Sequence, residues 1–214
     1  MTLRSLFLLG GAGALAATAP EWLARTGGEA ARLVVLSCGA GCRKYMPVYT
    51  DHWPAQFVGP DENGVLDVAQ ATALISGATG IFVAGGETEL YHSLYGVGPL
   101  RELIRARYAA GVAYAGLSAG ALLAMDTCVL YPPDVEGIAR LPGLGLLPDT
   151  LVGVHFTEQG GLDAFLPVVR RVVTTNIWGI DDDACLLFEN EVLSRSLGGD
   201  VYELDSVRVS GLAD

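Results

Sequence analysis

The sequence predicts an α/β fold, a three-layer sandwich with a mostly parallel central sheet and an antiparallel C-terminal edge. Two observations lead to this prediction. Short apolar runs alternate with stretches of helical spacing through most of the chain, and after residue 178 the helical stretches stop while short apolar runs follow one another across turns. The expected strands before that point are residues 5–9, 33–37, 56–58, 81–84, 112–115 and 151–154.

The first expected strand, residues 5–9, runs into a glycine-rich loop at residues 10–13. The first 20 residues also resemble an export signal, because an arginine and an apolar run precede a small-residue pattern. Glycines and similar breaks interrupt that run and a proline follows it, so we favour a buried strand and expect a cytoplasmic protein. The loop lacks G-x-G-x-x-G spacing, which argues against a dinucleotide site.

The remaining elements follow from periodicity and from turn residues. Residues 126–150 contain several prolines and glycines and are expected to form a long loop that covers the site or mediates the pairing of two copies of the chain. The last strands are expected to form an antiparallel meander, with a turn at residues 198–200. The expected helices are 65–76, 100–110, 119–125 and 162–173, and the expected late strands are 184–188, 192–197, 201–204 and 207–209.

Composition favours one globular domain over residues 1–214, since 51% hydrophobic residues in a chain of this length can build one substantial core. The net charge of −11 argues against nucleic acid or an anionic membrane surface as a partner. Lys44 is the single lysine, so the chain has almost no candidate for a Schiff base or a phosphate-loop lysine.

Cysteines and histidines do not follow a metal-binding pattern. Cys38 and Cys42 are close in sequence, but neither the other two cysteines, Cys128 and Cys185, nor the three histidines supply a second ligand pair with zinc-like spacing. We therefore expect buried or loop thiols, and we expect neither a metal nor a cofactor.

The most informative segment is 114–121, Tyr-Ala-Gly-Leu-Ser-Ala-Gly-Ala, in which Ser118 stands between two glycines directly after an apolar run. A strand-to-helix turn tight enough to expose a serine needs very small residues on both sides. Gly-x-Ser-x-Gly also occurs by chance in a glycine-rich chain, as a purely structural turn. The order helix, strand, serine turn and helix favours a catalytic nucleophile elbow.

A serine becomes a good nucleophile only when a base takes its proton, and the base is usually held in one tautomer by a carboxylate. Of the three histidines, His52 and His92 fall in helical or loop stretches, whereas His155 stands at the end of an apolar strand. A lone histidine there is often a structural residue, but the serine elbow favours His155 as the base.

In this order, several segments together resemble the serine peptidases that include aspartyl dipeptidase (peptidase E) and cyanophycinase, which have a fold related to class I glutamine amidotransferases. The resemblance extends through most of the chain. It is carried by the opening strand and glycine turn, a Gly-Gly turn, the serine elbow, the histidine strand and an acidic motif. These segments are residues 6–11, 82–88, 116–121, 153–156 and 179–184.

The resemblance implies a role for five residues. Ser118 would be the nucleophile, His155 the general base and then the general acid, and Asp182 the carboxylate that orients the histidine. The N–H groups of Gly86 and Ala119 would form the oxyanion hole. The expected substrate is a small peptide.

Two features depart from the family pattern. The acid is commonly glutamate, and Asp182 is one methylene shorter, with Asp181 or Asp183 as alternatives. Family members that recognise aspartyl substrates carry an arginine-rich turn after the histidine, whereas residues 157–164 hold no arginine and Arg170 is the first to follow. A carboxylate side chain would lack a cation partner, so the expected peptidase is not strictly aspartate-specific.

Other functions remain open at this stage. The chain could be a non-catalytic or regulatory member of the same fold, with a site that has lost its activity. It could also be an α/β-hydrolase-like esterase, in which Asp134 or Asp149 would supply the acid in the order serine, aspartate, histidine. A homodimer is possible.

Overall fold

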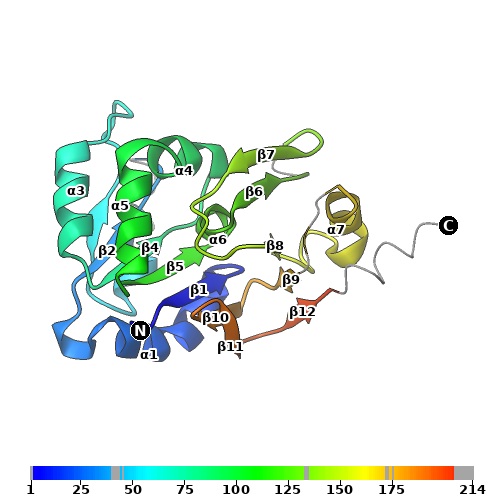
Figure 1. The fold of residues 1–214 in the computed structure, drawn as a ribbon, viewed down its shortest axis with the longest axis horizontal. Coiled ribbons are helices and arrows are strands. Elements are labelled where there is room, and N and C mark those ends of the chain that lie inside the picture. The colour runs from blue at the N-terminus through cyan, green and yellow to red at the C-terminus, as the bar shows by residue number, and fades with distance from the viewer. Residues whose placement is uncertain are drawn as a thin grey trace.

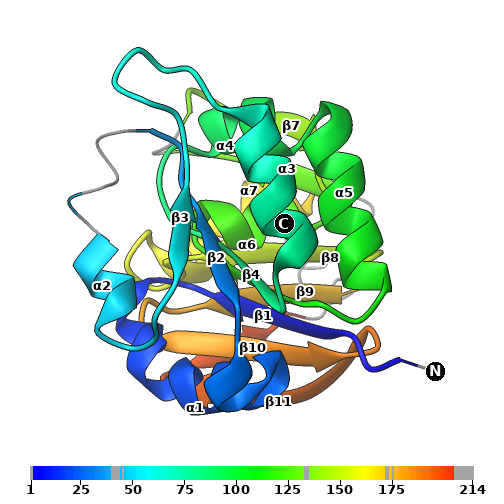
Figure 2. The same cartoon turned by 90° about the vertical axis from the view of Figure 1, so that its left-hand side faces the viewer.

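The computed structural model describes residues 2–39, 44, 46–132, 135–171, 174 and 176–204, and its centre is a seven-stranded sheet. Five neighbouring strands are parallel, and two antiparallel strands form one edge, which confirms the expected fold class (Figures 1 and 2). The strand order is β11 (Val192–Gly198), β10 (Ala184–Glu189), β1 (Ser5–Leu9), β5 (Ala113–Leu117), β4 (Gly80–Val83), β2 (Leu33–Leu36) and β3 (Gln56–Val58).

Helices cover both faces of this sheet. In Figure 1, α3 (Val68–Gly77), α4 (Thr88–Tyr95) and α5 (Gly98–Ala109) lie above the sheet, and α1 (Leu15–Thr26) lies below it. Trp22 of α1 packs edge-on against Phe7 and Phe82, with ring centroids 5.5 and 6.1 Å away, so the aromatic core joins α1 to β1 and β4. The shorter helical segments are η1 (Ala12–Ala14), η2 (Gly28–Ala30) and α2 (Met46–Thr50).

A second sheet of three strands lies beside the first, to the right in Figure 1. In it β8 (Thr150–Val154) is parallel to β9 (Asn176–Ile180), and β12 (Val201–Glu203) is antiparallel to β9. Together with α7 (Gly161–Val169) it encloses a small core of its own around Phe156 and Phe165.

Two sequence expectations about these strands are wrong. Residues 151–154 belong to the second sheet and not to the main sheet. The C-terminal meander is divided, because β11 pairs with β10 whereas β12 pairs with β9. At the turn between β11 and β12, Gly198 has a φ of +77° and the Gly199 N–H donates to Asp183 O at 2.9 Å, so the chain crosses between the sheets instead of folding back. The expected strand 207–209 lies outside the described residues.

The expected long loop at 126–150 contains a hairpin instead. Its strands, β6 (Thr127–Leu130) and β7 (Ala139–Pro142), pair antiparallel. Of the prolines that suggested a loop, Pro142 is the last residue of β7, where a missing N–H costs little, and Pro133 lies outside the described residues. Within the part of the chain that the structure describes, no helix combines the length and apolar character that crossing a bilayer requires.

Candidate active site

Ser118 stands at the sharp turn between β5 and α6 (Ala119–Ala124). Its backbone has a φ of +50° and a ψ of −110°, a conformation that L-residues rarely adopt and that is typical of functional sites. The Ser118 N–H donates to Leu9 O at 2.9 Å, which fixes the turn to the end of β1. The strain and this anchor together direct the serine side chain away from the sheet.

The glycines on both sides of Ser118 are required by packing. A Cβ on Gly116 would lie 2.2 Å from Gly120 O, and a Cβ on Gly120 would lie 2.2 Å from Val83 O. Neither position can hold a larger residue unless the backbone moves. The sequence argument for small residues at this turn therefore has a direct structural cause.

His155 and Asp182 meet Ser118 because their strands are parallel neighbours. His155 follows β8 and Asp182 lies two residues after β9, so both leave the second sheet at its carboxyl edge. Ser118 Oγ and His155 Nε2 are 2.8 Å apart, and His155 Nδ1 is hydrogen-bonded to Asp182 Oδ1. The side chains of His155 and Asp182 are 28% and 48% exposed, so the pair is open to small molecules. The structure thus brings together the three residues singled out from the sequence.

The neighbouring aspartates have different surroundings. Asp181 is buried, and its carboxylate accepts hydrogen bonds from the Thr157 N–H at 2.9 Å and from the Tyr202 hydroxyl at 3.2 Å. Desolvation, followed by the charge of Asp181, raises the pKa of Tyr202, so the phenol keeps its proton. Asp183 lies against Gly199, where a Cβ would be 1.8 Å from its Oδ1. Of the three, Asp182 is therefore the one that contacts His155.

The glycine loop after β1 makes room for this acidic motif. A Cβ on Gly10 would lie 2.1 Å from Asp181 O, and a Cβ on Gly11 would lie 2.6 Å from Asp182 Oδ1. The sequence identified this loop only as a glycine turn. Because the packing partners lie at residues 181–182, sequence spacing gave no signal of the contact.

The Gly-Gly turn after β4 packs beside the serine. A Cβ on Gly85 would lie 2.6 Å from Leu117 Cδ2 and 3.6 Å from Ser118 Cβ, and Gly86 has a φ of +149°. Ala119 is the first residue of α6, where an N–H group has no acceptor within the helix. The two residues expected to form the oxyanion hole thus come from segments that adjoin Ser118.

The other candidates from the sequence do not join this group. The His52 ring lies 5.9 Å from that of Trp53, and the buried Nε2 of His92 has no hydrogen-bond partner among the described residues. Asp149 is exposed and precedes β8, at the opposite end of the strand from His155. Asp134 lies outside the described residues.

Cys128 and Cys185 do not offer a competing nucleophile at this site. Burial raises the pKa of Cys128 and of Cys185 to about 12, so both remain thiols near neutral pH. Among the residues that the structure describes, no three His, Cys, Asp or Glu side chains gather as metal ligands would. Cys42 lies outside the described residues.

Comparisons with known proteins bear on this geometry. The family described as Peptidase family S51 matches residues 65–195, a range that contains Gly86, Ser118, His155 and Asp182. The cyanophycinase of Trichormus variabilis is 26% identical over 168 residues, which cover 72% of this chain and 56% of that protein. The cyanophycinase of Synechococcus elongatus is 29% identical over 145 residues, which cover 64% and 45%. The chain thus spans about half the length of the curated relatives it matches.

Two solved structures share the fold. A peptidase from an acI-B1 Actinobacterium superposes with a TM-score of 0.72 at 18% identity, over 95% of this chain and 91% of that one. A structure described as a putative peptidase E protein from Listeria monocytogenes EGD-e gives a TM-score of 0.64 at 14% identity, over 95% and 100%. At these identities the likeness concerns the fold.

Proposed function

This chain belongs to peptidase family S51, and we propose that it is a serine-type peptidase that hydrolyses small peptides through Ser118, His155 and Asp182. The observation that carries the proposal is the unbroken hydrogen-bond chain from Ser118 Oγ through the imidazole of His155 to the Asp182 carboxylate. A hydroxyl, a base and an orienting acid in this order are the groups that acyl transfer needs.

The proposed reaction begins when His155 Nε2 takes the proton of Ser118 as Oγ attacks the peptide carbonyl carbon. Asp182 accepts the Nδ1–H of the histidine, which keeps Nε2 free as a base and stabilises the imidazolium that forms. The imidazolium then donates its proton to the leaving amine, and the C–N bond breaks. A water molecule repeats the sequence on the acyl-enzyme and releases Ser118.

Negative charge develops on the carbonyl oxygen during both attacks. We assign the stabilisation of that charge to the N–H groups of Gly86 and Ala119, since both residues adjoin Ser118 and the Ala119 N–H is at a helix start. Gly86 fits this role because its φ of +149° is a backbone conformation that residues with a side chain rarely adopt.

The proposed substrates are not restricted to aspartyl peptides. Residues 157–164, which follow His155, contain no arginine, and Glu158 Oε1 lies 3.5 Å from Asp182 N. A substrate carboxylate here would meet negative charge and lack a matched cation. A dipeptidase activity on neutral peptides fits these observations.

A fluorophosphonate probe tests the proposal, because it reacts quickly only with an activated serine. We expect rapid labelling of the wild-type protein and none of Ser118→Ala, together with cleavage of dipeptides in a mixed library. A folded wild-type protein that neither reacts with the probe nor cleaves any peptide would contradict the proposal and favour a non-catalytic role.

A further inference from the structure

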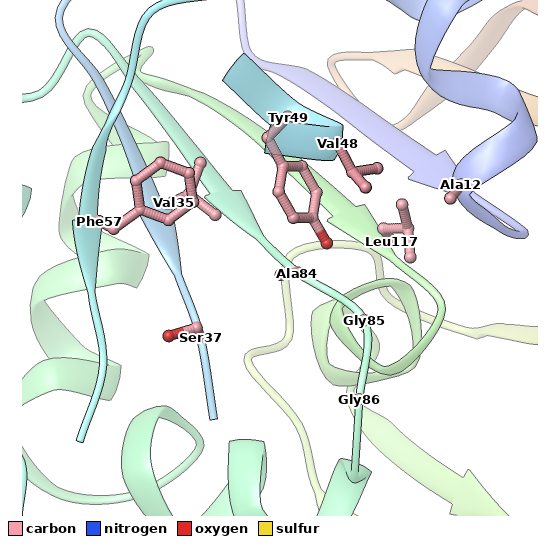
Figure 3. A pocket seen from close by; sticks show the side chains of 10 residues that line it. All are labelled: Ala12, Val35, Ser37, Val48, Tyr49, Phe57, Ala84, Gly85, Gly86 and Leu117. Carbon is pink, nitrogen blue, oxygen red and sulfur yellow. The ribbon is translucent and has the colours of Figure 1, made fainter. Parts of the chain in front are cut away.

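An apolar pocket of about 330 Å³ opens next to the proposed nucleophile (Figure 3). Val35 and Phe57 form one side of it, Val48 and Tyr49 cover it from α2, and Leu117, which directly precedes Ser118 in the chain, lies across the pocket from Phe57. The Gly85–Gly86 turn is part of its wall. The pocket therefore adjoins both the serine elbow and the turn assigned to the oxyanion hole.

Among the residues that the structure describes, those that line the pocket carry no charged side chain. Its polar side chains are those of Ser37 and Tyr49. Ser37 Oγ already donates to Val58 O at 3.3 Å, and the ring of Tyr49 packs against Phe82 with centroids 5.3 Å apart. An ionised group in this pocket would lose its hydration without gaining an oppositely charged partner among these residues, whereas an apolar group would gain burial.

The position of the pocket decides which part of a peptide enters it. The leaving amine must lie next to His155 Nε2, which protonates it, while the acyl carbonyl oxygen lies toward Gly86. The described residues that line the pocket belong to β2, β3, β5 or α2, or to the segments that follow β1, β2 and β4. None of these described residues belongs to the loops that carry His155 and Asp182. The pocket is thus on the acyl side of the scissile bond.

We propose that this pocket binds the side chain of the residue whose carbonyl is attacked, and that it selects large neutral apolar side chains such as those of leucine and phenylalanine. This inference rests on the proposed peptidase function. A volume of about 330 Å³ is at the lower end of the range for small-molecule pockets. It suits one large side chain, and the pocket thereby sets the substrate class of the enzyme.

Two dipeptide series test the assignment through kcat/KM. In the first series the acyl residue varies, as Phe-Leu, Leu-Leu, Ala-Leu and Asp-Leu. In the second the leaving residue varies, as Leu-Ala, Leu-Leu and Leu-Phe. We expect Leu-Leu or Phe-Leu to exceed Ala-Leu by about tenfold and Asp-Leu by about 100-fold, with a smaller spread in the second series. Equal rates in the first series, or a preference confined to the second, would overturn the inference.

A variant with a positive charge at the mouth of the pocket tests the same assignment from the side of the protein. Val48 is 38% exposed, so Val48→Arg brings a cation to the mouth without disturbing the core. The ratio of kcat/KM for Leu-Leu over Asp-Leu should fall at least tenfold. Val192→Arg is the control, because Val192 is 69% exposed on β11 and does not line the pocket. An unchanged ratio in Val48→Arg would contradict the assignment.

Measurements of peptide binding test this inference independently of the catalytic proposal. In Ser118→Ala the peptides stay intact, and calorimetry should show that Phe-Leu binds at least tenfold more tightly than Asp-Leu, with the difference reduced by Val48→Arg. This result would support the pocket even if the wild-type protein cleaves no peptide. Equal affinities would refute the pocket assignment even if Ser118 reacts with the fluorophosphonate probe.

Discussion

The carboxylate of Asp181 accepts a hydrogen bond from the backbone N–H of Thr157 at 2.9 Å. Thr157 lies two residues after His155, and Asp181 immediately precedes Asp182, so this bond ties together the two loops that carry the proposed base and acid. The Tyr202 hydroxyl donates to the other oxygen of the same carboxylate. Asp181 therefore holds the loops at a fixed separation.

Asp181→Ala should lower kcat by roughly 10-fold to 100-fold, because a shift of about 1 Å between reacting groups has effects of this size. The free energy of unfolding should fall by about 2 kcal/mol, since two hydrogen bonds of about 1 kcal/mol each are lost. Asp183→Ala is the control, because Asp183 is the exposed neighbour in the same acidic run. Equal kinetics in the two variants would show that Asp181 does not position the site.

Ser118→Ala should abolish hydrolysis while the melting temperature stays close to that of the wild type, since the side chain removed lies outside the core. His155→Ala should lose activity to a similar degree, on the order of 10⁴-fold or more, because members of such a triad act as a unit. His52→Ala should retain activity, as this ring packs on Trp53 away from the site. Activity within tenfold of the wild type in Ser118→Ala would disprove the serine mechanism.

Asp182→Asn should reduce kcat by about 10² to 10⁴-fold, because an amide can no longer stabilise the imidazolium and can favour the wrong tautomer. Asp149→Asn should have little effect, since Asp149 is at the far end of β8 from His155. Asp134→Asn discriminates between the two orders of the triad: a severe loss in that variant, with Asp182→Asn active, would favour the α/β-hydrolase arrangement.

Local patterns in the sequence were sufficient to predict most of the central sheet. The strand 56–58 was predicted with the bounds it has in the structure, and 5–9 likewise, because apolar runs between turn residues specify a buried parallel strand. Helix α1 was not predicted. Pro20 lies inside it, and a proline in a helix interior argues against a helix at the level of sequence. Trp22 provides the packing that stabilises the helix.

The sequence predicts those site residues that belong to a single local motif. It does not predict contacts between segments that are distant in the chain. Ser118 and His155 follow apolar strands, and the motif order indicated both. The contact of Gly11 with Asp182 and that of Tyr202 with Asp181 join segments that are far apart in the chain, which no periodicity reveals. The division of the late strands between two sheets likewise depends on tertiary packing, which local sequence patterns do not specify.

Gly86→Ala should lower kcat by about 10²-fold, the loss expected when one oxyanion donor is misplaced. A Cβ at this position would lie 2.9 Å from Cys38 Sγ, at a φ of +149° that L-residues avoid, so the turn must shift. Gly98→Ala is a matched control, since Gly98 also has a positive φ, +67°, but a Cβ there would meet no atom within 4 Å. A similar loss of kcat in both variants would point to a general folding effect.

The stability of the protein should decrease as the pH rises above about 8.5, the pKa of a cysteine thiol in an unfolded chain. Burial raises the pKa of the thiols of Cys128 and Cys185 to about 12 in the folded protein. Between these values the unfolded state has released thiol protons that the folded state retains. The free energy of unfolding therefore falls with pH, by up to about 1.4 kcal/mol per pH unit for each thiol, and below the unfolded pKa the contribution is constant.

Urea denaturation at pH 8 and pH 10 measures this effect. The control is the double variant Cys128→Ala/Cys185→Ala, which keeps every other titrating group, including Tyr108, whose pKa burial raises to about 12. Between the two pH values the wild type should lose a few kcal/mol more stability than the double variant, because only in the wild type does unfolding release the protons of the thiols of Cys128 and Cys185. Equal losses in the two proteins would mean that these thiols titrate in the folded state much as they do in the unfolded chain.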